Sequence, residues 1–144
     1  MTIHEEQRDL FTVPQGYYLA HCISADFALG AGIAKKFDEV YNMKFKLFKN
    51  YDGYEYECGD CLVVDNVFNL VTKPKCYHKP TYESLKEALK AMKEYVLYFD
   101  IDKIAMPHIA SGLDRLQWDQ VLEIIKEVFE DTDVNILICD YQGA

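Results

Sequence analysis

Apolar segments of strand length alternate with amphipathic segments of helix length from residue 17 onward. Continuous apolar runs, the pattern of buried strands, occupy residues 17–23, 61–65, 67–72, 103–107 and 134–139. Apolar residues recur every three or four positions, as in amphipathic helices, over residues 33–41, 82–99 and 118–129. This alternation predicts an α/β fold in which helices cover both faces of a sheet. Ligands bind such folds at the carboxyl ends of the strands.

The remaining features fit one domain. Residues 2–7 are expected to form a short edge strand, and Asp65-Asn66 is expected to form a tight turn between two paired strands. The chain has 144 residues, of which 50% are hydrophobic, enough for one core. We therefore expect a single domain over residues 1–144.

Charge and composition exclude several classes of protein. The net charge of -9 argues against a surface that binds nucleic acid over its whole extent, although a local basic patch remains open. No long apolar run or signal-like start is present, so we expect no membrane span and a cytoplasmic location. The single C-x-x-C, Cys58 to Cys61, has no second pair to complete a zinc site, so the five cysteines are interpreted as reduced thiols and no metal is implied.

Two segments, residues 20–34 and 106–118, each run from a strand through small residues directly into a helix. Backbone N–H groups at such a helix start are free to hold a phosphate, with the helix dipole behind them. In the first segment Gly30-Ala31-Gly32 lets the backbone approach an anion, but it matches neither the dinucleotide fingerprint nor a P-loop. Two such loops suggest a diphosphate, and a glycine turn that only packs helix against strand is the alternative.

Asp114 has two possible roles. Its spacing to Gln117 is that of a capping box, in which the aspartate accepts from a helical N–H and the glutamine reaches back. Spacing alone favours the cap over a catalytic acid or base. A carboxylate at the start of a phosphate-binding helix is already near a ligand, so the two roles can coexist.

Lys79 lies just before the longest amphipathic segment. Pro80 suits the first position of a helix and holds Lys79 extended. The helix dipole and the neighbouring Lys73, Lys75 and His78 disfavour an ammonium there, so we expect the amine to be shifted toward its neutral, nucleophilic form. A solvated surface lysine, the commoner fate of this residue, is the alternative.

Three other residues are candidates for chemistry. His21 lies within an apolar run and His108 directly follows one, and a hydrogen-bonded core histidine is the expected role of each. Tyr141 follows the last strand and is placed to contact a base or ring of a ligand. A packing role near the C-terminus is the alternative.

Six segments, in order along nearly the whole chain, carry a resemblance to a known family. They are Arg8-Asp-Leu-Phe11, Ala20-His-Cys-Ile-Ser24, Gly30-Ala-Gly-Ile-Ala34, Val71-Thr-Lys73, His78-Lys-Pro-Thr-Tyr-Glu83 and Gly112-Leu-Asp-Arg-Leu-Gln-Trp118. They resemble macrodomains, and more narrowly the terminal ADP-ribose protein glycohydrolase branch. The last two segments are the specific ones, because macrodomains in general have the glycine loops but lack Lys79 and Asp114.

The resemblance implies a three-layer α/β/α sandwich with a central mixed sheet and an ADP-ribose pocket at its carboxyl edge. It implies that Lys79 attacks the distal ribose at its anomeric carbon and that Asp114 handles protons and helps release the adduct. Asp9 would accept from the adenine amino group and Leu10 would frame the base. The remaining ligand-binding residues implied are Ser24, Leu29, Gly30, Ala31, Gly32, Ile33, Thr72, Ser111, Gly112, Leu113 and Arg115, to which Tyr141 is added from its position.

The sequence departs from the family pattern in two places. Arg8 stands where a glycine usually precedes the adenine aspartate, and Ala110-Ser111 replace a familiar glycine-cysteine pair. The second change keeps small residues, so diphosphate binding is expected to survive.

The function implied is a metal-independent hydrolase that removes mono-ADP-ribose from glutamate or aspartate side chains of modified proteins, without a cofactor. The alternatives are removal of ADP-ribose from nucleobases in DNA, deacetylation of O-acetyl-ADP-ribose, and a non-catalytic ADP-ribose reader. The cluster Lys73, Lys75, His78 and Lys79 motivates the nucleic-acid alternative, against which the acidic net charge counts. A minimal single domain suggests a monomer.

Overall fold

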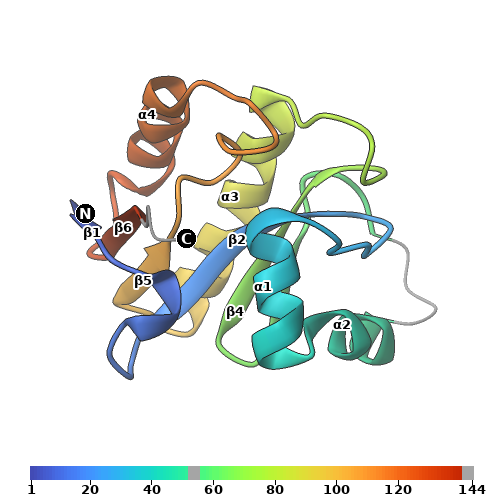
Figure 1. The fold of residues 1–144 in the computed structure, drawn as a ribbon. Helices are drawn as coiled ribbons and strands as arrows, with labels where there is room; N and C mark the ends of the chain where they lie inside the picture. The colour runs from blue at the N-terminus through green and yellow to red at the C-terminus, as the bar shows by residue number, and fades with distance from the viewer. Residues whose placement is uncertain (52–55, 141–144) are drawn as a thin grey trace.

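A six-stranded sheet lies between two layers of helices in the computed structural model, which describes residues 1–51 and 56–140 (Figure 1). The strand order is β1-β6-β5-β2-β4-β3. Across the described residues, β3 and β4 pair antiparallel and the other neighbours pair in parallel. The strands are β1 (Thr2–Gln7), β2 (Tyr18–Ser24), β3 (Cys61–Val64), β4 (Val67–Lys73), β5 (Lys103–Met106) and β6 (Asn135–Asp140).

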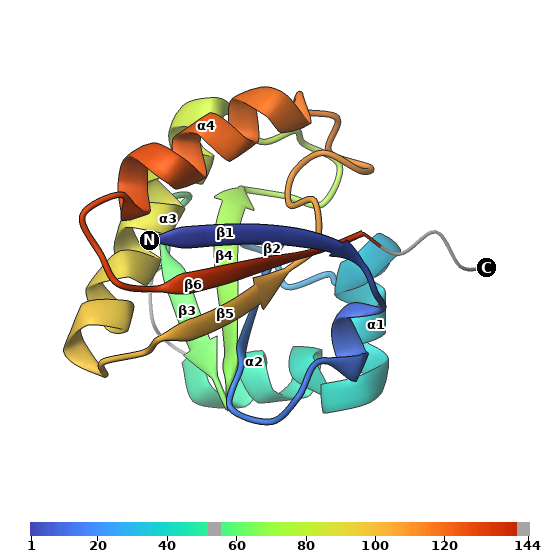
Figure 2. The same ribbon diagram turned by 90° about the vertical axis from the view of Figure 1, so that its left-hand side faces the viewer.

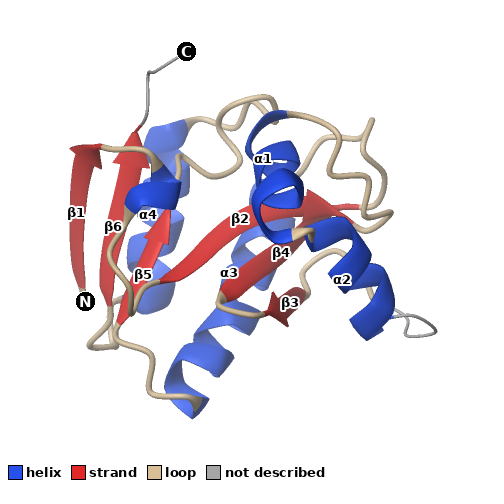
Figure 3. Cartoon of the chain, turned by 60° about the horizontal axis from the view of Figure 1, so that its bottom comes forward, coloured by secondary structure: helices blue, strands red, loops and turns tan. Residues whose placement is uncertain are grey.

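The helices are divided between the two faces of the sheet (Figure 3). One layer holds α1 (Gly32–Tyr41), α2 (Met43–Tyr51) and a 3-10 turn (Leu10–Thr12), and the other holds α3 (Tyr82–Tyr98) and α4 (Trp118–Phe129). Successive side chains of a strand point to opposite faces, so each strand supplies both cores. In β6, Ile136 and Ile138 pack with α3 and α4, whereas Leu137 and Cys139 pack with α1 and α2. This double burial explains the continuous apolar runs and confirms the predicted α/β/α sandwich with a mixed sheet.

Helix α3 begins later than the sequence predicted, because its N-cap residue follows Pro80. Thr81 is the N-cap: its hydroxyl accepts from Ser84 N at 2.9 Å, and Ser84 Oγ accepts from Thr81 N at 3.0 Å. Pro80 therefore precedes the cap and is buried, and does not occupy the first helical position as predicted. A reciprocal cap satisfies two backbone donors, which a proline at the first turn cannot do. Lys79 consequently lies two residues before the cap, on an exposed connection.

Helix α2 was not predicted. Asn42 ends α1 in a left-handed conformation with φ 56°, and its N–H donates to Asp38 O at 2.9 Å. The side chain of Asp38 then accepts from Lys44 N at 2.9 Å, which begins the next helix at once. Phe45 and Phe48 of α2 are exposed, so no clean apolar stripe marks this helix in the sequence.

The first strand pairs with the last. β1 runs parallel to β6, from Thr2 opposite Asn135 to Gln7 opposite Asp140, and Figure 2 shows the two side by side. The amino group of Met1 donates to Thr132 O at 2.5 Å and secures the start of the pair. Residues 2–7 thus form the edge strand predicted. In the described part of the chain, no helix is long and apolar enough to cross a membrane.

Candidate functional site

A cavity of about 900 Å³ opens at the carboxyl edge of the sheet, where β2, β4, β5 and β6 end. Parallel strands bring these ends to one edge, so loops distant in sequence meet there. The predicted site residues that line it are Asp9, Leu10, Ser24, Leu29, Gly30, Ala31, Gly32, Ile33, Lys79, Ser111, Gly112, Leu113, Asp114 and Arg115. The volume is in the range of small-ligand sites.

One predicted ligand residue in the described part of the chain, Thr72, is not among those that line it. Thr72 is only 1% exposed, and its carbonyl accepts from Ser84 Oγ of α3 at 2.7 Å. Side chains alternate along a strand, so its neighbour Lys73 reaches the cavity in its place. A role for Thr72 in ligand binding stays a prediction. Tyr141 lies outside the described residues.

The first loop is organised by Asp26. Its Oδ1 accepts from Ser24 Oγ at 2.5 Å and from Ala28 N at 3.2 Å, and its Oδ2 accepts from Cys76 N at 3.0 Å. Partial burial opposes ionisation, but the hydrogen bonds from Ser24, Cys76 and Ala28 outweigh it and lower the pKa of Asp26 below its usual value. Asp26 was missed from the sequence, although an aspartate that bonds the backbone two residues on is a recognised turn signal.

After Asp26 the loop leads into an uncapped helix start. Ala31 is the N-cap of α1 and offers no side-chain hydrogen bond to the helix. Leu29 and Gly32 both have positive φ, at 43° and 59°, which turns the backbone sharply ahead of the helix. A Cβ on Gly32 would lie 3.1 Å from Leu113 Cδ1, so the two loops pack closely at this glycine. The arrangement presents helix N–H groups to the cavity, as an anion site requires.

The second loop contains two strained residues. Ala110 and Arg115 have φ of 60° and 64°, a region that costs non-glycine residues energy. The loop is closed by Leu116 N donating to Ala110 O at 2.8 Å and tied to α3 by Gln117 N donating to Tyr82 Oη at 3.0 Å. Ala110 is where the family usually has glycine, so this departure carries strain. Arg8 is the other residue at which the sequence departs from the family pattern. It is not among the described residues with positive φ.

Asp114 does not cap α4. The N-cap is Gln117, three residues later, and it too lacks a side-chain capping bond. The predicted capping box is therefore wrong, because the chain from Ser111 to Gln117 forms a closed turn before the helix begins. Asp114 Oδ1 instead accepts from Lys73 Nζ at 2.8 Å, and both side chains are only 16% exposed. Lys73 was not predicted as a site residue. Its position at the end of a predicted buried strand, where ligands of such folds bind, could have indicated it.

Lys79 approaches the same loop from the β4–α3 connection. It is exposed, and its Nζ donates to Leu113 O at 3.0 Å. The two predicted catalytic residues thus meet at one rim of the cavity, Lys79 at the carbonyl immediately before Asp114.

At the opposite end of the cavity, Asp9 caps the 3-10 turn by accepting from Phe11 N at 3.0 Å, and Leu10 is buried beside it. Arg8 N donates to Asp140 O at 3.1 Å and extends the β1–β6 pairing into this turn. The bond from Phe11 N fixes the direction of the Asp9 carboxylate.

The environments of His21 and His108 differ. His21 is fully buried, stacks on Phe37 with ring centroids 3.9 Å apart, and its Nε2 lies 2.5 Å from Asn69 Oδ1. Burial, partly offset by the Asn69 bond, lowers its pKa to about 4, so it is a neutral core residue as predicted. His108 lines the cavity and stacks on Trp118 at 4.2 Å, so its predicted core role is wrong because β5 has already ended at Met106.

One group of described side chains has the composition of a cation site. Glu5, His108 and Asp140 each offer a ligand atom, and these atoms lie within 4.8 Å of one another. His108 Nε2 lies 3.1 Å from Glu5 Oε1, the distance of an ordinary hydrogen bond, so these two side chains form a histidine–carboxylate pair.

The five cysteines are all free, as predicted. Cys22 and Cys139 line the cavity. Burial and the charge of Asp114 raise the pKa of the Cys22 thiol to about 12, and burial raises that of Cys139 to about 11. A thiol with so high a pKa is a poor nucleophile at neutral pH, so these two serve the cavity as small apolar wall residues.

Comparison with known proteins identifies relatives. No model of a known protein family matches the chain. The chain is 42% identical over 134 residues to the ADP-ribose glycohydrolase OARD1 of Bos taurus, covering 90% of this chain and 86% of the relative. It is 41% identical over 134 residues to the human protein of the same name, with the same coverage.

Solved structures share the fold. The macrodomain of Thermus aquaticus DarG superposes with a TM-score of 0.82 at 20% identity, covering 96% of this chain and 97% of that one. The macrodomain of Mycobacterium tuberculosis DarG gives 0.81 at 21% identity, covering 99% of each chain. Identity this low establishes the fold alone. Together with the closer sequence relatives, these structures place the chain in the macrodomain family, among the homologues of ADP-ribose glycohydrolase OARD1.

Proposed function

We propose that this macrodomain hydrolyses the ester that links mono-ADP-ribose to glutamate or aspartate side chains, with Lys79 as nucleophile and Asp114 as its partner. The observation that carries the proposal is the convergence of Lys79 and Asp114 on one rim of the cavity: Lys79 Nζ contacts the carbonyl of Leu113, 34 residues later in the sequence and directly before Asp114. Relatives of about 42% identity named as ADP-ribose glycohydrolases support it.

The cavity offers a place for each part of ADP-ribose. The uncapped start of α1 and the Gly30–Gly32 turn suit the diphosphate, since free N–H groups and the helix dipole favour an anion. Asp9 and Leu10, at the far end, suit the adenine. The distal ribose then lies between the two loops, with its anomeric carbon toward Lys79 and Asp114.

In the first step the Lys79 amine attacks the anomeric carbon of the distal ribose. A C–N bond forms, the C–O bond to the acyl group breaks, and the protein carboxylate leaves with the electron pair. A carboxylate is a stable leaving group, so this departure needs little help from an acid. The negative Asp114 stabilises the positive charge that develops on the sugar and accepts a proton from the nitrogen.

In the second step water adds to the sugar carbon and the C–N bond breaks. Asp114 returns the proton to the departing amine, which regenerates Lys79. The Asp114 carboxylate then takes the proton that the attacking water loses and passes it to solvent as ADP-ribose is released. The balance requires only water and the two side chains, so the reaction proceeds without a metal or a cofactor.

The test is release of ADP-ribose from a glutamate-linked protein. Wild-type protein should release it, and Lys79→Arg, which keeps the cation but removes the usable amine, should lose at least about 100-fold in kcat. Lys90→Ala, at an exposed lysine of α3, serves as the control and should be unaffected. Borohydride reduction during turnover followed by mass spectrometry should place the sugar on Lys79. Full activity of Lys79→Arg would exclude the mechanism.

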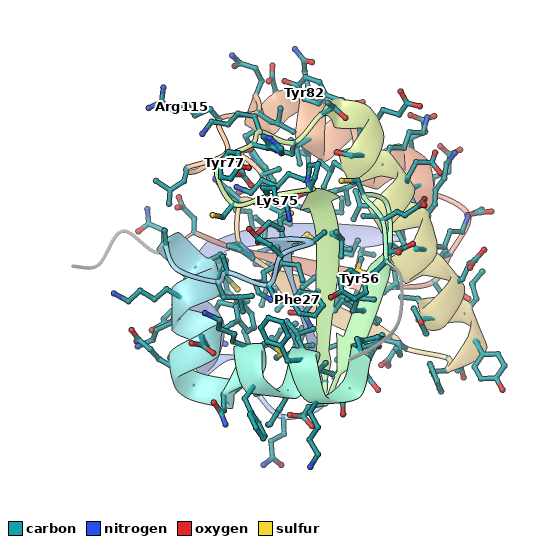
Figure 4. All side chains as sticks on the ribbon, turned by 90° about the vertical axis from the view of Figure 1, so that its right-hand side faces the viewer. Phe27, Tyr56, Lys75, Tyr77, Tyr82 and Arg115 are labelled. Atoms are coloured by element: carbon teal, nitrogen blue, oxygen red, sulfur yellow. The ribbon has the colours of Figure 1, made fainter. Side chains whose placement is uncertain are left out.

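A second candidate function is removal of ADP-ribose from a nucleobase in DNA. Lys75 and His78 are exposed on the β4–α3 connection, and Tyr77 between them is 76% exposed. In the view of Figure 4, Tyr77 lies between Lys75 and Arg115. An aromatic ring among cations is suited to stack a base and contact its phosphates. Comparing turnover on glutamate-linked, serine-linked and nucleobase-linked substrates decides between the two, and a reader would bind ADP-ribose without turning over any of them.

A further inference from the structure

The ion pair between Lys73 and Asp114 is more enclosed than any other among the described residues. Both of its side chains are 16% exposed, whereas every other recorded pair has a partner at least 38% exposed. Taking two charges out of water costs much of what their attraction returns, so such a pair contributes little net stability. Its position in the cavity wall indicates a different role.

Lys73 is held rigidly. It is the last residue of β4, and the β2–β4 register shifts so that Ser24 stands opposite it. Its carbonyl accepts from Ala25 N at 2.9 Å, which fixes the backbone between two central strands. The cation is therefore carried by the sheet, whereas Asp114 is carried by a loop with a strained residue, Arg115, directly after it.

Asp114 has no competing structural role in the described chain. It does not cap α4, whose N-cap is Gln117. Lys73 is the recorded hydrogen-bond partner of its carboxylate, at 2.8 Å. The direction of this carboxylate is therefore set from β4.

Lys79 contacts a neutral group instead. Its Nζ donates to Leu113 O at 3.0 Å, the carbonyl of the residue before Asp114. An amine paired with a carboxylate is held as an ammonium, which has no lone pair with which to attack carbon. Lys73 thus pairs with the Asp114 carboxylate, whereas Lys79 contacts the same loop at the carbonyl of Leu113.

We propose that Lys73 is a positioning residue for hydrolysis: it fixes the Asp114 carboxylate toward the cavity and prevents it from pairing with Lys79. This inference rests on the proposed function. The two lysines then have separate tasks: Lys73 holds the Asp114 carboxylate in place from the sheet, and Lys79 attacks the sugar from the connection that follows.

The test uses Lys73→Met, Lys73→Arg and a matched control, Lys46→Met. Lys46 forms an ion pair with Asp65 at 2.6 Å on the surface of α2, outside the cavity. Lys73→Met should lower kcat on glutamate-linked substrate by about 10- to 100-fold, the cost of a misplaced catalytic group. Lys73→Arg should restore kcat to within about 5-fold because it can still pair with the carboxylate. Lys46→Met should retain wild-type kcat.

Two measurements distinguish a loss of Asp114 positioning from a general disruption of the site. The dissociation constant for ADP-ribose, measured by calorimetry, should stay within about 3-fold in Lys73→Met, because Lys73 acts through Asp114 and not on the diphosphate. In a double-mutant cycle with Asp114→Asn, the double variant should have nearly the kcat of Asp114→Asn alone, since both changes remove one interaction. Losses that multiply would overturn the inference.

The outcomes also distinguish this inference from the function on which it rests. A wild-type protein that releases no ADP-ribose from a glutamate-linked substrate overturns the proposed function, and the positioning role with it. An active wild type whose Lys73→Met variant keeps full kcat overturns the positioning role alone.

Discussion

The carboxylate of Asp26 accepts a hydrogen bond from the backbone N–H of Cys76 at 3.0 Å, across 50 residues of sequence. The same carboxylate holds Ser24 and Ala28 of the first loop. One side chain therefore links the loop proposed to hold the diphosphate to the connection that carries Lys79. Both halves of the candidate site are positioned through it.

Replacing Asp26 by Asn should loosen this link. An amide has one acceptor oxygen and cannot accept from both Cys76 and the first loop, so we expect the free energy of unfolding at pH 7 to fall by about 1 kcal/mol. The pKa of Asp26 lies below its usual 3.8 in the folded protein, so its contribution is present above that value and is lost as the pH falls below it. Urea unfolding at pH 7 and pH 3 should show a smaller difference between the two proteins at the lower pH. An equal difference at both would contradict the assignment.

His21 should make the protein sensitive to mild acid. Its pKa falls from 6.5 to about 4 on folding, so the unfolded chain takes up the proton first and stability decreases as the pH falls through that interval. The loss should reach about 2 kcal/mol at pH 5. His21→Gln retains a donor for Asn69 and removes the titration. Urea midpoints measured from pH 7 to pH 5 should therefore change less in the variant than in wild type.

Replacing Gly32 by alanine should destabilise the protein more than replacing Gly30. Gly32→Ala places a Cβ at φ 59° and 3.1 Å from Leu113 Cδ1, so the free energy of unfolding should fall by about 1–2 kcal/mol. The nearest atom to a Cβ on Gly30 is Ala28 O at 3.9 Å, and Gly30→Ala should change stability by less than about 0.5 kcal/mol. Thermal unfolding measures both. Equal losses of unfolding free energy in the two variants would show that the close packing of the two loops does not require glycine at position 32.

Turnover should not depend on a metal ion. The proposed nucleophile is an amine, which needs no metal to become reactive, so dialysis against EDTA should leave kcat unchanged. If activity were lost and returned with zinc or magnesium, Glu5, His108 and Asp140 would be the first side chains to replace. The matched control is the dialysed protein without chelator.

The sheet and three helices were predictable because their signals are local and repeated. Alternate residues of β6 face two cores, which yields a continuous apolar run, and α3 carries an unbroken stripe of buried residues. Helix α2 gave no such signal, since its start depends on the left-handed Asn42 and two of its phenylalanines are exposed. The local pattern around Lys79 left a nucleophile and a solvated surface lysine both open, and the resemblance to a known branch decided between them.

The pairing of charges within the site was not predictable. Asp114 and Lys73 are 41 residues apart, and their contact depends on how the second loop closes ahead of α4. The spacing to Gln117 favoured a cap that the backbone does not form. His108 followed an apolar run and was expected in the core, but the strand ends before it and leaves it stacked on Trp118.

The parallel pairing of β1 with β6 has a consequence for the order of folding. Thr2 lies opposite Asn135, so the sheet joins the two ends of the described chain. Closing so long a loop carries a large entropic cost before any contact repays it. On the ribosome, residues 2–7 must wait for the last strand to emerge before they can pair. The edge next to the proposed adenine end of the cavity should therefore be the last part of the sheet to form.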